Sequence, residues 1–269
     1  MAAMLVVEWS QFLKEALPLE GNPSAVTVGV FDGVHRGHKS LIDRVVSQKK
    51  HAVPVVVCFK QSQHKEKSID GREYPGDILT MRQKTAVFDS LGVSITIIIE
   101  FSEPLMRMRG ADFLRILQER GKMSFMAVGS DFRCGYQLDT DAPVIKEMNA
   151  DLDIQTCVVQ PLTEGGQPIS SSQIRAAIAQ GNLKEAAAML GRPFSVDLFG
   201  ASVLHTAEGD SYDIAGRGGI LPPPGRYHVL LLGKDFFQNG GKPAEITIEE
   251  GRVIIAENLK GVFPEYVKF

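Results

Sequence analysis

The sequence predicts a doubly wound α/β domain on a parallel five-stranded sheet, followed by a small all-β barrel-like domain. Along the first two thirds of the chain, short β-branched runs alternate with segments of helical apolar spacing, which is typical of parallel strands joined by crossover helices. Beyond residue 192, short alternating runs separated by Gly- and Pro-rich turns favour antiparallel strands. The 269 residues, 44% of them hydrophobic, suffice for about two domains at roughly 150 residues each.

Five near-continuously apolar runs are the expected parallel strands, because helices cover such strands on both faces. They are Ala25–Phe31, Pro54–Phe59, Ser94–Glu100, Phe125–Gly129 and Ile154–Val159. Apolar stripes at helical spacing lie at 41–46, 113–117, 174–178 and 186–190. The stretch between Phe59 and Thr80 is expected to be a mobile loop.

The first domain is expected to span residues 1–192. Gly191 directly follows the last helical stripe and Pro193 comes soon after, which is a helix stop signal. The second domain, 193–269, is expected to contain strands at 195–204, 227–232, 245–248 and 252–256. The last two flank a turn at Glu249-Glu250-Gly251.

The composition limits the classes of function. Lys and Arg number 29 against 32 Asp and Glu, and the net charge of -3 provides no basic surface, so we expect neither nucleic acid nor a membrane as partner. Cys58, Cys134 and Cys157 lack CxxC spacing, which argues against a disulfide framework or a zinc knuckle. No apolar run has the length of a membrane span and the opening residues lack signal-peptide features, so a cytoplasmic location is expected.

The stretch Val28–His38 lies where the first expected strand turns into a helix, which is where open α/β sheets bind ligands. Its three glycines allow the backbone to approach a ligand closely, and the N–H groups of a helix beginning near His38 attract anions. His35 and His38 can donate hydrogen bonds to phosphate oxygens. The stretch therefore predicts a polyphosphate site.

A metal site, a different type of nucleotide site and a plain turn are the alternatives for this stretch. His-x-x-His is half of a metal site, but zinc needs a third and usually a fourth ligand, and none has a suitable spacing nearby. Neither the Gly-x-Gly-x-x-Gly pattern nor the P-loop pattern occurs in the chain. In a plain turn, the glycines only shape the backbone and the histidines are solvated.

Two further clusters follow expected strands at the same sheet edge. Asp131, Phe132 and Arg133 combine an acid, a ring and a guanidinium in one turn, which suits a planar ring system; a capped turn is the alternative. Pro168–Arg175 opens a helix with three serines and an arginine, which suits an anion. An N-cap serine plus a surface arginine is the alternative there.

Together the clusters resemble the adenylyltransferase half of bacterial FAD synthetases, the bifunctional riboflavin kinase and FMN adenylyltransferase proteins of the nucleotidylyltransferase superfamily. The resemblance spans residues 25–194, and its motifs are Gly29-x-Phe31-Asp32-Gly33-Val34-His35-x-Gly37-His38, Gly129-x-Asp131-Phe132-Arg133, Ile169-Ser170-Ser171-x-x-Ile174-Arg175 and Leu190-Gly191-Arg192-Pro193-Phe194. It implies a nucleotidylyltransferase-type sheet in domain 1–192 and a riboflavin kinase-like β-barrel in domain 193–269.

The resemblance also implies an activity, which is the Mg²⁺-assisted transfer of AMP from ATP to FMN, giving FAD and pyrophosphate. ATP and FMN are then the small-molecule partners, and Mg²⁺ accompanies ATP. The implied roles are catalysis for His35, His38 and Arg175; ATP binding for Gly29, Phe31, Asp32, Gly33, Gly37, Ser170, Ser171 and Ser172; and flavin binding for Phe59, Asp131, Phe132 and Arg133. No metal ligand and no oligomeric state is assigned.

The chain departs from the family pattern in both domains. Lys60 and a run without proline follow Phe59 where the family carries Phe-x-Pro-His-Pro, and Cys134 stands where the family carries Phe, so another phosphorylated acceptor is an alternative to FMN. The second domain lacks the family's Pro-Thr-Ala-Asn segment, reads Ser211–Ala215 where that segment should follow, and ends without the later acidic strand. We therefore expect a degenerate barrel without riboflavin kinase activity. A non-catalytic flavin- or nucleotide-binding paralogue is the remaining alternative.

Overall fold

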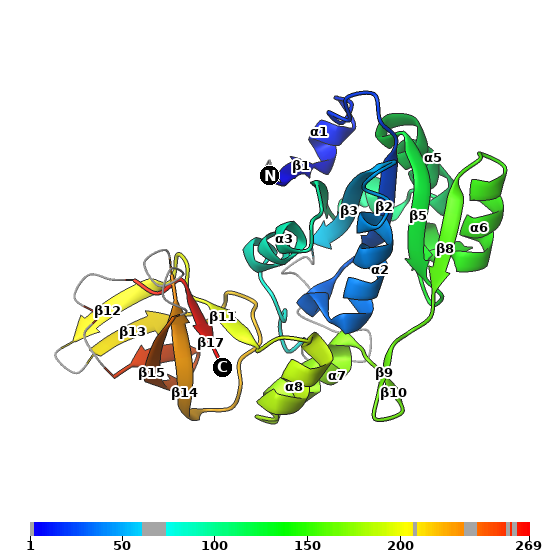
Figure 1. Ribbon diagram of the computed structural model, residues 1–269. Helices are drawn as coiled ribbons and strands as arrows, with labels where there is room; N and C mark the ends of the chain where they lie inside the picture. The colour runs from blue at the N-terminus through cyan, green and yellow to red at the C-terminus, as the bar shows by residue number, and fades with distance from the viewer. Residues whose placement is uncertain (1–2, 61–73, 207–208, 234–240, 257–258, 260–262) are drawn as a thin grey trace. The chain divides into compact units, whose positions relative to one another are not determined.

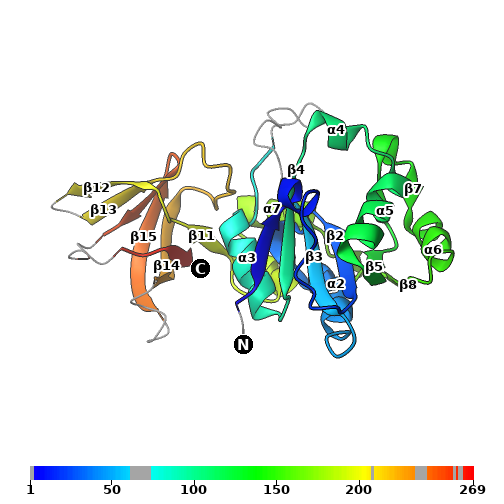
Figure 2. The same cartoon turned by 90° about the horizontal axis from the view of Figure 1, so that it is seen from above.

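The computed structural model describes residues 3–60, 74–206, 209–233, 241–256, 259 and 263–269, so most of the loop expected between Phe59 and Thr80 lies outside the described residues. The chain forms two compact units. Unit 1 comprises Met1–His64 and Lys84–Pro168, and unit 2 comprises Lys65–Gln83 and Ile169–Phe269. The elements of each unit are labelled in Figure 1 and seen from above in Figure 2.

Unit 1 is built on a six-stranded parallel sheet with the order β1-β4-β3-β2-β5-β8. Its strands are β1 (Leu5–Glu8), β2 (Ser24–Gly29), β3 (Val53–Lys60), β4 (Ile95–Glu100), β5 (Met123–Gly129) and β8 (Gln155–Val159). Every neighbouring pair is parallel, and the five predicted strands correspond to β2, β3, β4, β5 and β8. The predicted α/β class is confirmed.

The helices of unit 1 cover both faces of this sheet (Figures 1 and 2). They are α1 (Trp9–Phe12), α2 (Arg36–Val46), α3 (Met81–Ser90, which begins in unit 2), α4 (Glu103–Met106), α5 (Gly110–Gly121) and α6 (Ala142–Ala150). Crossovers between parallel strands are right-handed, and their direction reverses after β4, which puts α2 and α5 on opposite faces. Trp9 of α1 packs on Phe12 and Phe113, at 5.3 and 5.6 Å between ring centroids.

The sheet order creates one place where ligands are expected. The chain moves outward from β2 through β3 to β4 and then returns to β5 on the other side of β2. The connections after β2 and β5 therefore leave the sheet in opposite directions, and a crevice forms at the carboxyl ends of these two strands. The glycine-rich turn follows β2 and the Asp131–Arg133 turn follows β5, so both predicted clusters lie at this crevice.

The elements of unit 1 that sequence reasoning did not locate include β1, α3 and α6. Strand β1 pairs with β4 at the sheet edge, where Leu5 and Val6 are 40% and 43% exposed and only Val7 is buried. Such a short, half-exposed strand gives no continuous apolar run. Helix α3 buries the polar residues Gln83 and Lys84, so its apolar spacing is broken. Helix α6 buries only Ala142, Ile145 and Asn149, and one of these is polar, so its apolar stripe is too weak to recognise in the sequence.

Unit 2 contains a seven-stranded antiparallel sheet with the order β11-β17-β14-β15-β16-β13-β12. Its elements are α7 (Ser171–Ala179), α8 (Leu183–Leu190), β11 (Ser195–Asp197), β12 (Ser202–Thr206), β13 (Gly209–Asp213), β14 (Gly225–Leu232), β15 (Lys242–Glu249), β16 (Arg252–Ile255) and β17 (Tyr266–Lys268). The predicted all-β barrel-like class is confirmed. Within the described ranges no ladder joins β11 to β12, so the sheet is open rather than closed.

Strand prediction in unit 2 was correct for β14, β15 and β16 and incomplete elsewhere. Residues 195–204 form two strands rather than one, β11 and the start of β12. Strands β13 and β17 were missed, because the first is a mostly polar run and the second has three residues. The predicted turn between β15 and β16 is present, with Glu250 and Gly251 at φ of +44° and +77°, as a tight hairpin requires.

Helices α7 and α8 pack with the β-sheet of unit 2. Ile174, Ile178 and Leu190 share one apolar cluster with Phe194 and Val253, which explains why the compact units divide at Pro168–Ile169. The helix end predicted at Gly191 is confirmed, with φ of +67° at the C-cap. A domain boundary at residue 192 stays a prediction. No helix in the described part of the chain is long and apolar enough to cross a membrane.

Candidate active site

The turn after β2 has an unusual backbone. Phe31, Gly33 and Val34 have φ of +49°, +76° and +38°, and only glycine enters this region without a steric penalty from Cβ. A β-branched residue such as Val34 at positive φ stores strain on the order of 1–3 kcal/mol. Strain of this size persists only where the surrounding structure holds the turn in place.

Lys84 of α3 supports this turn. It is 1% exposed, and its Nζ donates a hydrogen bond to the carbonyl oxygen of Val30 at 3.2 Å. The Cys58 thiol donates to the same Val30 carbonyl oxygen at 3.5 Å, and burial raises the pKa of this thiol to about 11. An ammonium buried without such partners would be costly. Sequence analysis missed Lys84 because a cation on a buried helix face leaves no periodic signal.

His35 and His38 occupy different positions in the turn. His35 is 5% exposed and is the N-cap of α2, with its Nδ1 accepting a hydrogen bond from the backbone N–H of His38 at 3.3 Å. Because Nδ1 accepts, His35 carries its proton on Nε2 in this arrangement. The two rings stack at 3.6 Å and 21°, and His38 meets the edge of Phe31 at 5.3 Å. The helix thus begins at Arg36, two residues before the predicted start.

Ring packing explains two of the three glycines in the motif. A Cβ on Gly37 would lie 3.2 Å from Cε1 and Nδ1 of His35, and a Cβ on Gly29 would lie 3.2 Å from Cζ of Phe31. These separations are shorter than ordinary carbon contacts. Gly33 is explained by its positive φ. Each glycine therefore has a structural reason within the turn itself.

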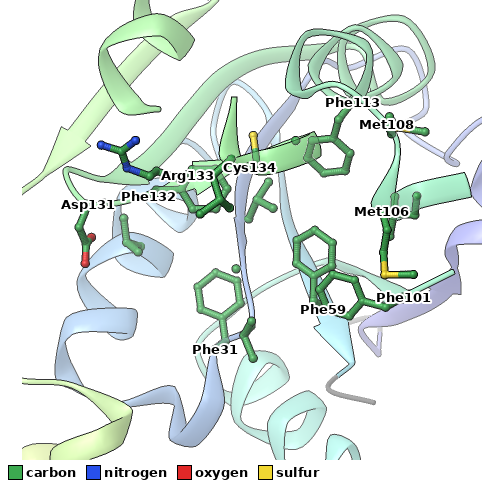
Figure 3. Close-up of a pocket in the computed structure, with 18 of the residues that line it drawn as sticks. Phe31, Phe59, Phe101, Met106, Met108, Phe113, Asp131, Phe132, Arg133 and Cys134 are labelled. Atoms are coloured by element: carbon green, nitrogen blue, oxygen red, sulfur yellow. The ribbon is translucent and has the colours of Figure 1, made fainter. Parts of the chain in front are cut away.

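A cavity of about 560 Å³ opens at the carboxyl ends of β2 and β5. Figure 3 shows Phe59, Phe101, Phe113 and two methionines on one side of it and Asp131, Phe132 and Arg133 on the other. The rings of Phe59 and Phe101 both line it and stack on each other, with 5.1 Å between ring centroids and 17° between ring planes. Leu105 and Met106 of α4, Met108 of the loop after α4 and Phe113 of α5 also line it.

The loop after β5 is pinned beside α5. It contains β6 (Arg133–Cys134), the 3-10 turn η2 (Tyr136–Leu138) and β7 (Thr140–Asp141). Oδ1 of Asp139 accepts hydrogen bonds from the Gly110 N–H at 3.0 Å and the Thr140 hydroxyl at 2.9 Å. These bonds hold the pKa of Asp139 below its usual value. Because they tie the loop to the start of α5, they fix the cavity wall that Cys134 contributes.

The third predicted cluster belongs to unit 2. Ser170 is the N-cap of α7, as predicted for one of the serines, and accepts a hydrogen bond from the Gln173 N–H at 3.3 Å. Ser171 and Ser172 begin the helix. Nε of Arg175 donates to the carbonyl oxygen of Gly76 at 3.1 Å, and its Nη2 donates to the Tyr74 hydroxyl at 3.3 Å.

The structure sorts the predicted site residues into three groups. The cavity is lined by Gly29, Phe31, His38, Phe59, Asp131, Phe132 and Arg133. Asp32, Gly33 and His35 lie in the turn that precedes α2, and Gly37 lies in the first turn of that helix. Ser170, Ser171, Ser172 and Arg175 lie in unit 2. In the chain as described, no group of three or more His, Cys, Asp or Glu side chains is arranged to hold a metal ion.

Several cavity residues were not predicted as site residues. Phe101, Leu105, Met106 and Met108 follow β4, and Leu138 lies in the loop after β5. Met106 and Leu138 are 56% and 58% exposed, which is high for large apolar side chains. The only sequence signal for such a cavity is a set of apolar residues in short irregular segments beside a strand end. Because these residues have no fixed spacing, the signal is hard to recognise.

Comparisons with known proteins identify a family for this chain. The FAD synthetase family matches residues 18–173, which is more than half of the chain. The bifunctional riboflavin kinase/FMN adenylyltransferase of Escherichia coli (strain K12) is 28% identical over 221 residues, covering 80% of this chain and 70% of that protein. The FAD synthetase of Listeria monocytogenes is 28% identical over 178 residues, covering 66% of this chain and 72% of its own.

A solved structure shares the fold over nearly the whole chain. The structure described as a macrolide-efflux protein from Streptococcus pneumoniae superposes with a TM-score of 0.78 at 21% identity, covering 98% of this chain and 88% of that one. At this identity the likeness concerns the fold alone. Because the FAD synthetase family matches more than half of its length, this chain belongs to that family.

Proposed function

We propose that this chain transfers the AMP group of ATP to the phosphate of FMN, giving FAD and pyrophosphate. The cavity between the ends of β2 and β5 carries the proposal. Its volume of about 560 Å³ and its aromatic lining, which includes the stacked rings of Phe59 and Phe101, suit the planar ring system of a flavin. His38 and the start of α2 border the same cavity and supply hydrogen-bond donors for phosphate.

The reaction depends on position and charge compensation. A phosphate oxygen of FMN attacks the α-phosphorus of ATP, the bond from that phosphorus to the oxygen bridging to the β-phosphate breaks, and pyrophosphate leaves with the bonding electron pair. No protein nucleophile takes part. The N–H groups at the start of α2 and the His38 imidazole bind the polyphosphate and stabilise the charge that develops on it.

Mg²⁺ enters as the complex with ATP. When bound, the ion offsets phosphate charge during the transfer. Among the described lining residues, Asp131 is the single carboxylate, and Mg²⁺ in such sites is held mainly by substrate phosphates and water with one or two carboxylates. The side chains present therefore fit an ion that arrives with its nucleotide.

Unit 2 is proposed to contribute Arg175 and the serines at the start of α7 to phosphate binding, and its β-sheet to lack riboflavin kinase activity. Residues 211–213, which stand where the family's missing segment should follow, lie in β13 between β12 and β16, and Tyr212 is 2% exposed. This packing supports a structural role for the segment. We keep the expected domains, 1–192 and 193–269, and a cytoplasmic location as parts of the proposal.

The test is an assay of the purified chain with MgATP, with FMN and riboflavin supplied separately and the flavins resolved by chromatography. We expect FAD from FMN and no FMN from riboflavin. His38→Ala should lower kcat by about 100-fold while changing the Kd for ATP by less than about threefold, because the imidazole stabilises developing charge. His51→Ala, an exposed histidine after α2, is the matched control and should leave both unchanged.

Two outcomes would contradict parts of the proposal. Formation of FMN from riboflavin would show that the β-sheet of unit 2 retains kinase activity. Retained ATP binding with no product from FMN would favour a different acceptor or a binding protein.

One observation favours a phosphorylated acceptor other than FMN as the alternative substrate. Cys134 lines the cavity and is 8% exposed, at the position where the resembled family carries Phe. A thiol in place of a phenyl ring leaves more room at that wall, which suits a phosphorylated acceptor of different shape. A screen of phosphorylated ring compounds with MgATP, read by pyrophosphate release, distinguishes the two acceptors.

A further inference from the structure

Arg175 is held by a segment far away in the sequence. Its Nε donates to the carbonyl oxygen of Gly76 at 3.1 Å, and its Nη2 donates to the Tyr74 hydroxyl at 3.3 Å. The guanidinium carbon lies 5.1 Å from the centroid of the Tyr74 ring. Because a guanidinium is planar, bonds from two of its nitrogens fix both its position and its plane.

Tyr74 is fixed in turn by a carboxylate. Its hydroxyl donates a hydrogen bond to Oδ1 of Asp77 at 2.6 Å. A phenol has one proton to donate, so donation to Asp77 directs its lone pairs toward Arg175. Each of the two hydrogen bonds involves a charged group, either the Asp77 carboxylate or the Arg175 guanidinium. Hydrogen bonds to charged groups are stronger than those between neutral groups. Tyr74 therefore connects the carboxylate of Asp77 to the guanidinium of Arg175.

The β-sheet portion of unit 2 holds this segment through backbone contacts. The Asp77 N–H donates to the carbonyl oxygen of Gly218 at 2.6 Å, and the Ile220 N–H donates to the carbonyl oxygen of Asp77 at 2.9 Å. Gly76 has φ of +107°, and a Cβ there would lie 2.7 Å from backbone atoms of Gly219 and Ile220. The two backbones thus approach more closely than any side chain would allow.

We propose that Tyr74 and Asp77, held by the loop Gly218–Ile220, are positioning residues that preorganise Arg175 for the polyphosphate. The inference rests on the proposed function, in which Arg175 binds phosphate. A long arginine side chain that is already ordered loses less conformational freedom when the nucleotide binds. The β-sheet, for which no kinase activity is proposed, then contributes to adenylyl transfer by holding this segment.

A double-mutant cycle on the full chain tests the inference. Tyr74→Phe keeps the ring beside Arg175 and removes the hydroxyl, and we expect kcat/KM for ATP to fall about tenfold. Arg175→Ala should cause a larger loss, and adding Tyr74→Phe to it should change the rate by less than about twofold. Tyr227→Phe is the matched control, since its hydroxyl donates to the Pro223 carbonyl oxygen at 2.6 Å in the same unit without contacting Arg175.

The outcomes separate the inference from the proposed function. The positioning role would be overturned if Tyr74→Phe lowered kcat/KM by the same factor in the wild-type chain and in the Arg175→Ala variant. It would also be overturned if Tyr74→Phe and Tyr227→Phe lowered kcat/KM equally. If the wild-type chain makes no FAD, the same cycle is measured on the Kd for a non-hydrolysable ATP analogue. Non-additive effects of the two substitutions on this Kd would support the positioning role without the proposed reaction, and additive effects would overturn it. If the wild-type chain does not bind the analogue, both the positioning role and the proposed function are overturned.

Discussion

His35 and His38 illustrate how one short motif divides its work between residues. His35 caps α2 and is buried, whereas His38 lies in the first turn of that helix and lines the cavity. Their rings stack at 3.6 Å, so a displacement of one ring displaces the other. The orientation of His38 therefore depends on the space that Gly37 leaves for His35.

Gly37→Ala tests that dependence. The added methyl would lie 3.2 Å from the His35 ring and should push it out of its capping position. We expect stability to change by less than about 1 kcal/mol, because the loss of a cap, about 1 kcal/mol, is offset by a similar gain in helix propensity. We expect kcat/KM to fall about tenfold, measured by the FAD assay alongside urea unfolding.

Gly121→Ala is the matched control for that substitution. Gly121 ends α5, and a Cβ there would meet its nearest neighbour, Phe12, at an ordinary 3.7 Å. It should leave kcat/KM unchanged. If both variants behave alike, the Gly37 effect would reflect a general response to alanine rather than the His35 contact.

Sequence reasoning located these residues but not their roles. Glycine and histidine beside a strand end are visible as a motif, yet an imidazole that caps a helix and one that faces a ligand have the same spacing. The role of Lys84 could not be predicted for another reason. Its hydrogen bond to the Val30 carbonyl oxygen joins α3 to a turn 54 residues earlier in the sequence. Contacts of that range are set by tertiary packing, which local patterns do not encode.

At the scale of elements, the loop after β5 is held by a charged group. Asp139 accepts hydrogen bonds from Gly110 and Thr140, which lower its pKa below the unfolded value of about 3.9. A carboxyl with a depressed folded pKa stabilises the protein above the unfolded pKa, and this stability is lost as pH falls through the folded pKa.

Asp139→Asn should therefore destabilise the chain at pH 7 and have a smaller effect near the low folded pKa, where the wild-type carboxyl is protonated. Urea unfolding of both proteins across that acidic range measures the difference. An equal difference in stability at every pH would show that the charge of Asp139 contributes nothing and that only its shape matters.

The elements that sequence reasoning found and missed differ in composition. The runs that form β2, β3, β4, β5 and the edge strand β8 are near-continuously apolar and were found, whereas the short β1, with two of its residues more than a third exposed, was not. Strand β13 is paired on both sides but reads Gly-Asp-Ser-Tyr-Asp, so its place in the sheet depends on partners rather than on its own composition. Asp210 and Tyr212 of β13 are buried, but the polar composition of the strand gives no apolar run by which to recognise it.

For the molecule as a whole, the fold class was predictable and the strand order was not. Alternating strands and helices indicate a parallel sheet, but nothing local shows that β2 lies between β3 and β5. That order is what places the turn after β2 beside the turn after β5 and so forms the cavity. Likewise, the sequence pattern separated α7 and α8 from the β-sheet, whereas they share one apolar cluster with it.

The contact between Trp9 and Phe113 allows flavin binding to be followed by tryptophan fluorescence. Trp9 is the single tryptophan of the chain, and Phe113, against which it packs, also lines the cavity. A flavin bound there would lie one aromatic ring away from the indole and should quench its emission by energy transfer. Titration with FMN should lower tryptophan fluorescence to a saturating limit, after correction against free tryptophan, and Trp9→Phe should abolish the signal. Constant emission from protein that retains FMN through dialysis would place the flavin elsewhere.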